Sequence, residues 1–335
     1  MSLDLYAIGN ALVDREYPVD DALLVRCDLQ KGTMQLAESA QQEGLISLLN
    51  QHTTANGQVS GGSAANTAFA VAALGASAFY ACRVGDDDAG SFYLADLASA
   101  GVQTSPISQE VGQTGSCVVL VTPDGERTMQ THLGITAALS PAQVDLEPLQ
   151  NARFLYIEGY LATSDSARAA VTVVRELARA QGSKIAISLS DPAMVQYAKH
   201  GLLEMLEGGV DILFCNEMEA LLFTEQTDLN AAIAQLQTYS PLVVVTLGAK
   251  GAVIGEPNGI IQPIPPQTVT QVLDTNGAGD GFAGGFLYGM SQNFTLVDCG
   301  YLATAVASAV VEQYGPRLPR QRYAQILHQM VSQQA

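Results

Sequence analysis

Short apolar runs alternate with stretches of helical periodicity through the second half of the chain. The runs span 154–157, 185–189, 212–215 and 242–247, and the clearest helical stretch between them covers 164–181. Short runs rich in β-branched residues are typical of buried strands. Strands that alternate with helices form a mostly parallel sheet with helices on both faces. We therefore expect an α/β fold with its functional site at the carboxyl ends of the strands.

The first half of the chain continues this pattern but interrupts it twice. Apolar runs at 5–9 and 79–84 predict two more strands, and an Ala-rich stretch from Ser60 to Gly75 predicts a helix. Two further segments, about 12–38 and 112–133, are β-like and carry no helical stripe, and the second contains a hairpin turn. We expect both segments to form strands and no helix.

Composition indicates one domain that spans residues 1–335. The chain is 48% hydrophobic and 14% charged, no linker divides it, and no apolar run is long enough to cross a bilayer. The first residues lack the basic and apolar stretches of a signal peptide. We therefore expect a cytoplasmic protein without a membrane partner.

Charge and cysteine usage disfavour two kinds of ligand. The formal net charge is −18 and no basic cluster is present, which makes nucleic-acid binding unfavourable. A nucleotide polyphosphate would also be repelled unless local amide groups or a divalent cation offset this charge. Five scattered cysteines and four histidines show no metal-ligand spacing, so we expect buried free thiols and no zinc site.

The glycine-rich stretch from Asp274 to Asp280 carries the clearest chemistry. It precedes a run with apolar residues at 282, 286, 287 and 290, so the glycines lie where a loop becomes a helix. Free backbone N–H groups at a helix start attract an anion, and glycines let the backbone approach it. Asp280 would repel that anion, which suggests a base that takes a proton from an attacking hydroxyl group. The alternative is that Asp280 caps the helix.

This stretch resembles the D-T-x-G-A-G-D signature of the PfkB carbohydrate kinases, the ribokinase family. The chain departs from it at Asn276, where Thr is usual. Four more stretches resemble motifs of the family in the same order, so the resemblance covers nearly the whole chain. They are Gly9–Asp14, Gly61–Asn66, Asn216–Glu219 and Thr246–Gly251.

The resemblance implies a ribokinase-like three-layer sandwich with a mostly parallel central sheet and a small β-sheet lid. The lid would be formed by segments 12–38 and 112–133. It also implies ATP-dependent phosphorylation of a primary hydroxyl group on a sugar or ribonucleoside, with an appearance closest to the adenosine-kinase-like members. Asp280 would be the base, and the amides of Gly277, Ala278 and Gly279 would stabilise the transferring group.

The resemblance assigns the acceptor and lid residues as well. The acceptor would be bound by Asp14, Asn10, Gly61, Gly62 and Asn66. The alternative for the glycines and Asn66 is a tightly packed helix, and for Asp14 it is a loop aspartate at a strand exit. Arg127 would meet the transferring phosphoryl group, or it forms a surface ion pair with Glu126 or another acid.

Two motifs would hold the nucleotide and its metal. The nucleotide residues implied by the resemblance are Thr246, Gly248, Gly251, Asn216, Asp274 and Thr275. Asn216 and Glu219 would organise Mg²⁺ or its water shell, although a capped helix start explains both residues equally well. An ordinary hairpin turn is the alternative for Gly248 and Gly251. A monovalent cation such as K⁺ stays open.

Two other functions are compatible with parts of the sequence. A catalytically silent sugar or nucleotide sensor on the same fold would have no need for the base at Asp280. A dehydrogenase is disfavoured because no G-x-G-x-x-G follows the first strand. The sequence leaves open which hydroxyl compound is the acceptor, and whether the protein is a monomer or a homodimer.

Overall fold

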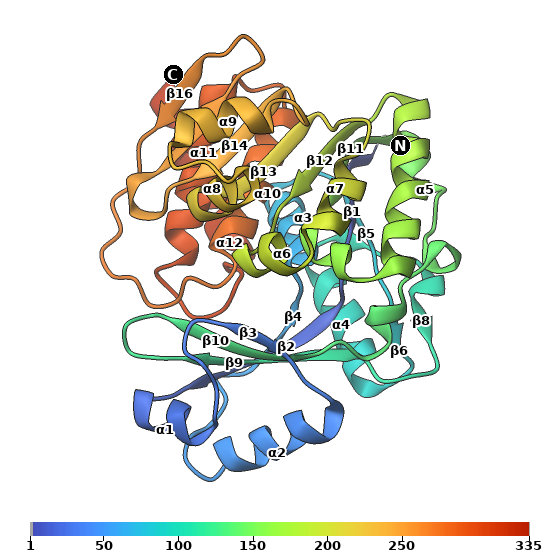
Figure 1. Cartoon of the computed structure of the whole chain (residues 1–335), viewed down its shortest axis with the longest axis vertical. Helices are drawn as coiled ribbons and strands as arrows, with labels where there is room; N and C mark the ends of the chain where they lie inside the picture. Colours follow the sequence, from blue (N-terminus) through green and yellow to red (C-terminus); the bar gives the residue numbers. More distant parts are fainter. Residues whose placement is uncertain (1–2, 335) are drawn as a thin grey trace.

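A nine-stranded sheet forms the centre of the larger part of the molecule (Figure 1). The computed structural model describes residues 3–334. The strand order is β16-β15-β14-β13-β12-β11-β1-β5-β7, in which β14 to β7 are parallel and the last hairpin is antiparallel. The strands are β1 (Leu3–Ile8), β5 (Ala78–Ala81), β7 (Val102–Gln103), β11 (Ala152–Ile157), β12 (Lys184–Ser188), β13 (Ile212–Asn216), β14 (Leu242–Thr246), β15 (Ala252–Gly255) and β16 (Ile261–Ile264).

Helices cover both faces of this sheet because its strands are apolar on both sides. In β1, Leu5 and Ala7 join one hydrophobic cluster, whereas Tyr6 and Ile8 join the other. The first cluster includes side chains of α3 (Ser63–Leu74), α4 (Asp88–Ser99), α10 (Ala278–Ser291), α11 (Leu296–Val310) and α12 (Arg320–Gln334). The second includes side chains of α5 (Asp165–Gln181), α6 (Pro192–Tyr197), α7 (Lys199–Leu206), α8 (Glu217–Thr224) and α9 (Leu229–Leu236).

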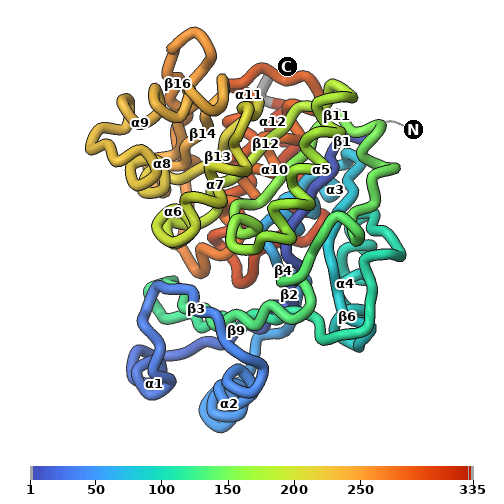
Figure 2. The backbone as a smooth tube through the Cα atoms, turned by 45° about the vertical axis from the view of Figure 1, so that its right-hand side comes forward, coloured from blue at the N-terminus to red at the C-terminus, as the bar shows by residue number. Residues whose placement is uncertain are grey.

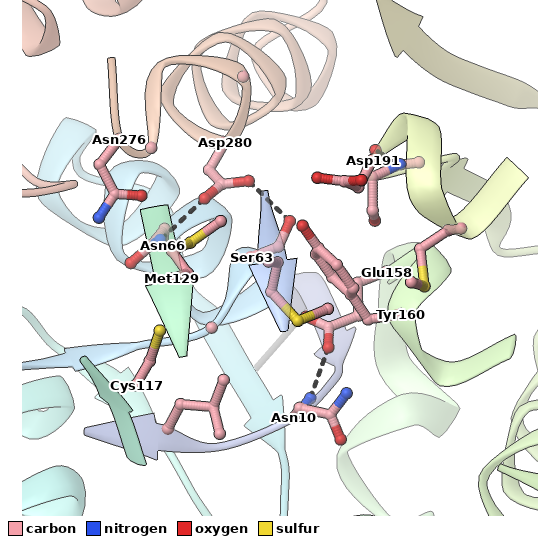
Figure 3. Close-up of a pocket in the computed structure, with 18 of the residues that line it drawn as sticks. Asn10, Ser63, Asn66, Cys117, Met129, Glu158, Tyr160, Asp191, Asn276 and Asp280 are labelled. Carbon is pink, nitrogen blue, oxygen red and sulfur yellow. Dashed lines mark hydrogen bonds between the residues drawn. The ribbon is translucent and has the colours of Figure 1, made fainter. Parts of the chain in front are cut away.

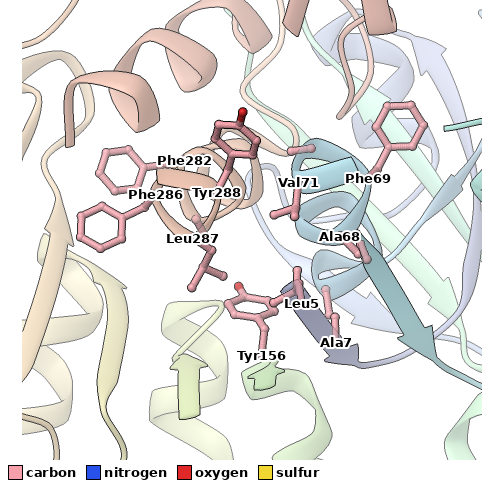
Figure 4. Packing of buried hydrophobic residues seen from close by; sticks show 14 of the residues in the cluster. Leu5, Ala7, Ala68, Phe69, Val71, Tyr156, Phe282, Phe286, Leu287 and Tyr288 are labelled. Carbon is pink, nitrogen blue, oxygen red and sulfur yellow. The ribbon is translucent and has the colours of Figure 1, made fainter. Parts of the chain in front are cut away.

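The close packing of α3 against α10 positions the site. Figure 4 shows Leu287 of α10 above Tyr156 of β11 and Leu5 of β1, with Val71 of α3 beside it. A Cβ atom at Gly284 would lie 2.6 Å from the Cβ of Ala70, so only a small residue fits where the two helices touch. This short separation brings the first turn of α3 next to the first turn of α10.

A five-stranded sheet lies below the large one, in the order β3-β10-β9-β2-β4 (Figure 2). Its strands are β2 (Leu12–Pro18), β3 (Met34–Leu36), β4 (Gln58–Gly61), β9 (Gly115–Val121) and β10 (Arg127–His132). Helices α1 (Asp21–Arg26) and α2 (Ser39–Leu49) pack on the outer face through Leu24 and Leu45. The inner face therefore stays free to face the large sheet. A two-stranded pairing of β6 (Val84–Gly85) with β8 (Gln109–Glu110) completes the strands.

The three-layer sandwich with a mostly parallel sheet and a second, small sheet is confirmed. Segments 12–38 and 112–133 both supply strands to the small sheet, and β4 joins them. The expectation that 12–38 contains no helix was wrong. Helix α1 is only six residues long, so it shows no helical stripe, and it is held by the Asp20 cap and the burial of Leu23 and Leu24. Within residues 3–334, no helix has both the length and the apolar character that a bilayer crossing requires.

Candidate active site

A cavity of about 330 Å³ lies between the carboxyl ends of the parallel strands and the inner face of the small sheet (Figure 3). Most of the residues that the sequence singled out line it. They are Asn10, Asp14, Gly62, Asn66, Arg127, Asn216, Glu219, Thr246, Thr275, Gly277, Gly279 and Asp280. Five others are not among the lining residues, namely Gly61, Gly248, Gly251, Asp274 and Ala278.

Residues 274–279, here named the anion loop, lead into the N-terminus of α10. Gly277 has a φ of +72°, a left-handed value that favours glycine. A Cβ atom on it would lie only 2.6 Å from the Cα of Pro316. At Gly279 an added Cβ would meet no atom within 4 Å, so its backbone is open to the cavity. The backbone of Gly279 is thus accessible to an anion in the cavity, whereas the N–H of Ala278 donates to the Thr275 carbonyl group at 3.3 Å.

Asp274 shapes the anion loop from behind. Its side chain is fully buried, and its two oxygens accept hydrogen bonds from the backbone N–H groups of Asn276 (2.8 Å) and Gly315 (2.9 Å). A carboxylate in this position holds the loop against the chain segment that follows α11. The structure therefore gives Asp274 a supporting contact rather than a place on the cavity wall.

The carboxylate of Asp280 faces the cavity and is held by two side chains of α3. Ser63 Oγ donates to one oxygen (2.6 Å) and Asn66 Nδ2 donates to the other (2.8 Å), as Figure 3 shows. Burial raises the pKa of Asp280, and these two hydrogen bonds act in the opposite direction. Gly277 is the capping residue of α10, which has no side-chain cap. The alternative that Asp280 merely caps the helix therefore does not hold.

Asn66 contacts protein groups on both sides of its amide. Its Nδ2 donates to Asp280, and its Oδ1 accepts from Nε of Arg317 at 2.8 Å. The side chain is only 5% exposed. Asn66 thus orients Asp280 in this structure, which is a different contact from the acceptor hydroxyls that the sequence assigned to it.

Two further carboxylates lie around the cavity. Burial and the nearby charge of Asp280 raise the pKa of Asp14 to about 7, against the opposing charge of Arg317. A Cβ on Gly61 would overlap the carboxyl group of Asp14, so this glycine makes room for the acid instead of lining the cavity. Glu158 is completely buried, and burial raises its pKa to about 7.

Glu158 was missed by sequence reasoning although it binds two predicted segments together. Its oxygens accept from the backbone N–H groups of Asn10 (2.7 Å) and Ala64 (2.8 Å). It connects the exit of β1 to the first turn of α3. The available signal was its position directly after the predicted strand at 154–157, where α/β proteins place functional side chains.

Arg127 reaches from β10 of the small sheet to the anion loop. Its Nε donates to Thr275 Oγ1 (3.2 Å) and its Nη1 donates to Asn276 Oδ1 (2.9 Å). Among the ion pairs of residues 3–334 none includes Arg127, so the surface pair with Glu126 is not formed. Asn276, the position that departs from the family signature, supplies one of its two acceptors.

Asn216 and Glu219 form a reciprocal cap at the start of α8. Asn216 Oδ1 accepts from the Glu219 N–H (2.8 Å), while the Asn216 N–H and Nδ2 donate to the two Glu219 oxygens (3.0 and 2.6 Å). Glu219 is buried, and burial raises its pKa to about 7. Within the described part of the chain, no three His, Cys, Asp or Glu side chains are grouped to hold a metal ion. These two residues therefore fit the water shell of a metal better than direct coordination.

The turn after β14 is a tight hairpin. Thr246 ends the strand and lines the cavity, but Gly251 has a φ of +91° and packs against the backbone of Ile264. Lys250 forms an exposed ion pair with Glu217 at 3.6 Å. The two glycines of this turn shape the hairpin, and Thr246 is the member of this motif that reaches the cavity.

An apolar wall was also missed. The side chains that form it come from the inner face of the small sheet and the turn after β10. They are Leu12, Met34, Leu36, Cys117, Met129 and Leu133. Leu36 is 60% exposed at the sheet edge, so the wall offers apolar surface that a bound molecule can cover. Alternation in short strands was too weak a signal to show that these residues share one face.

Comparisons with known proteins place this fold and site among the small-molecule kinases. The chain belongs to the pfkB family of carbohydrate kinases, whose family model matches residues 40–322.

Its relatives include both adenosine kinases and sugar kinases. The adenosine kinase of Saccharomyces cerevisiae is 26% identical over 96% of this chain and 98% of its own. A crystal structure of adenosine kinase from Sinorhizobium meliloti has a TM-score of 0.92 and 34% identity, with 98% of this chain and 99% of that chain covered. A probable sugar kinase from Rhizobium etli has the same TM-score and coverage at 33% identity. The chain is thus a kinase whose relatives are named both for adenosine and for sugars.

Proposed function

We propose that this kinase transfers the γ-phosphoryl group of ATP to a primary hydroxyl group of a ribonucleoside or sugar. One observation carries the proposal. The Asp280 carboxylate is held by Ser63 and Asn66 in the cavity, directly beside the open backbone of Gly279 at the start of α10. This arrangement provides a base for the hydroxyl group and a site for the phosphoryl oxygens within one turn of helix.

The residues act in a simple order. Asp280 accepts the proton of the acceptor hydroxyl group as that oxygen attacks the γ-phosphorus. The amides of Gly277, Ala278 and Gly279 donate to the oxygens of the transferring group, whose charge Arg127 also meets. Thr246 and Thr275 offer hydroxyl groups to the nucleotide phosphates. Mg²⁺, when bound, neutralises phosphate charge, and Asn216 and Glu219 would hold its water shell.

The acceptor end of the cavity favours a ribonucleoside over a free sugar. Asp14 can accept hydrogen bonds from two neighbouring hydroxyl groups when it is ionised. The apolar wall then faces whatever is attached to the sugar, and a free pentose has nothing to cover Leu36 or Met129. A nucleobase would cover both. The adenosine kinases among the relatives support the same choice.

Exchange of Asp280 for Asn tests the base. We expect kcat to fall by about 10² to 10⁴, the usual contribution of a positioned base, with the fold retained. The assay measures ADP release with a panel of adenosine, inosine, guanosine, ribose and fructose. Asp165→Asn is the matched control, since that side chain is 96% exposed at the start of α5. An unchanged kcat in folded Asp280→Asn would disprove the mechanism, and binding without turnover across the panel would favour a sensor.

The small sheet would act as a lid that excludes water while the phosphoryl group is transferred. Its inner face carries Arg127 to the anion loop, so closing it completes the site. We expect ATP hydrolysis without acceptor to be at least about tenfold slower than phosphoryl transfer with acceptor. A tenfold difference in rate corresponds to about 1.4 kcal/mol in the activation free energy. Equal rates would contradict the lid.

A further inference from the structure

The chain segment that follows α11 touches the site at three separate points. We name residues 315–318 the C-terminal strap. Its Gly315 N–H donates to Asp274, and Pro316 fills the space that a side chain at Gly277 would need. Arg317 reaches further, to Asn66 of α3. The strap thus backs both the anion loop and the residue that holds Asp280, although it contributes no residue to the cavity wall.

Arg317 is unusually buried for an arginine. Its side chain is 5% exposed and its guanidinium group stacks on the Phe69 ring at 4.7 Å. Its Nη1 donates to Ser60 Oγ and to Asp96 Oδ2, and the latter distance is 3.2 Å. Among the described residues, its Nη2 has no hydrogen-bond partner. The contacts of Nε and Nη1 thus fix where the guanidinium group lies.

The chemistry of the guanidinium group fixes the amide of Asn66. An arginine has only donors, so the Asn66 atom that faces Nε must be the carbonyl oxygen. The amide nitrogen then has to face Asp280, to which it donates. If the amide turned round, its oxygen would face the carboxylate and repel it. Arg317 therefore determines which of these two orientations Asn66 adopts.

We propose that Arg317 is a positioning residue for phosphoryl transfer, which acts by orienting Asn66 so that this amide holds the Asp280 carboxylate towards the acceptor hydroxyl group. The inference rests on the proposed function, since it takes Asp280 to be the base. It adds a residue that lies in none of the family-like motifs and more than 35 positions after the base in the chain.

Other charged and titratable groups also face Asp280, and a test has to distinguish their effects on Asp280 from that of Arg317. They come from the small sheet, from the end of β11, from the segment after it and from α12. They are Asp14, Arg127, Tyr156, Glu158, Tyr160 and Tyr323. Asp14 and Glu158 each have a pKa of about 7 and titrate in the working range, so a pH profile alone would mix their effects with that of Asp280.

A double-mutant cycle at a single pH isolates the coupling between Arg317 and Asn66 from the titration of these other groups. We expect Arg317→Met and Asn66→Ala each to lower kcat by about tenfold to a hundredfold, the usual effect of misplacing a catalytic group, with KM for acceptor and ATP changed less than about threefold. The double variant should be no slower than the slower single variant, because both changes remove one interaction. Arg320→Met is the matched control, since Arg320 donates to the Ser99 carbonyl group and does not line the cavity, so kcat should stay unchanged.

Two results would overturn the inference. One is an unchanged kcat in folded Arg317→Met, and the other is a double variant whose loss is the product of the single losses. If Arg317→Met does not fold, Arg317→Lys replaces it in the same cycle. Lysine keeps the positive charge near Asp96 but cannot donate to Asn66, Ser60 and Asp96 from one planar group, so the same loss and the same coupling to Asn66 are expected.

A crystal structure of the Arg317 variant tests the inference independently of any activity measurement. We expect the Asn66 amide to have left Asp280, and an amide still within hydrogen-bond distance of the carboxylate would refute the inference. Failure of the proposed function looks different. In that case Asp280→Asn would keep full activity, or no acceptor would be phosphorylated, while the Asn66 displacement in the variant would still be seen.

Discussion

Two glycines of the anion loop, only two residues apart, should respond to the same substitution in opposite ways. At Gly277 the backbone is left-handed, and an alanine there costs about 1–2 kcal/mol for the conformation alone. Its methyl group would also lie 2.6 Å from the Cα of Pro316 and closer still to the carbonyl oxygen of that residue. Overpacking of this kind costs about 1–3 kcal/mol. We expect Gly277→Ala to lower the free energy of unfolding by about 2–5 kcal/mol.

At Gly279 the same methyl group meets nothing. The residue lies in the first turn of α10 with ordinary helical backbone, and its Cβ would point into open space in the cavity. Replacing a helical glycine by alanine stabilises by at most about 1 kcal/mol, so the fold should be unaffected or slightly more stable. The methyl group would, however, occupy the space beside the amides that we assign to the phosphoryl oxygens. We expect Gly279→Ala to lose at least about tenfold in kcat/KM for ATP, or about 1.4 kcal/mol of transition-state binding.

Urea unfolding and steady-state kinetics on both variants separate the two effects. The structural reasoning requires a large loss of stability at 277 with little loss at 279, and a loss of activity at 279 in a fully folded protein. Equal unfolding midpoints for the two variants would refute the assigned backbone geometry. Full activity of Gly279→Ala would refute the position of the phosphoryl group.

Two other substitutions follow from the site. Burial raises the pKa of Glu158 from 4.5 to about 7, so the native state holds the proton more tightly than the unfolded state. The contribution of Glu158 to stability is therefore complete below pH 4.5 and is lost as the pH rises through 7. Urea unfolding from pH 4.5 to 8 should therefore show a flatter decline in Glu158→Gln than in the parent, and an equal decline would contradict the pKa assignment. Asn276→Ala removes one acceptor of Arg127, so kcat/KM for ATP should fall about tenfold, or about 1.4 kcal/mol. Unchanged kinetics with ATP would show that Arg127 does not depend on Asn276.

The sequence predicted the large sheet well because its strands are buried on both faces. The runs 212–215 and 242–247 are apolar except for Thr246, and β13 and β14 match them to within one residue. The small sheet was harder to predict since its strands other than β9 are only partly buried and mix polar with apolar residues. Helix α1 and strand β4 were missed because each is too short to show a periodic pattern.

The site was predictable where its residues are neighbours in sequence. The anion loop and Asp280 form one continuous motif, and Gly277 of that motif is required by its left-handed backbone. Glu158 and Arg317 belong to no such motif, because they reach the site only when distant segments pack together. A lone acid after a strand and a lone arginine near the end of the chain have no local pattern that separates them from surface residues.

The division of the site between two sheets has a consequence for turnover. Asp14 and Arg127 belong to the small sheet, whereas Asp280 and the amides of α10 belong to the body of the large one. Only residues 9–11 separate β1 from β2. On the proposed mechanism, each contact that holds the small sheet down brings the reacting groups together, and each must also break before the phosphorylated product can leave. Stronger contacts between the small sheet and the body of the protein would therefore speed the reaction only until product release becomes the rate-limiting step.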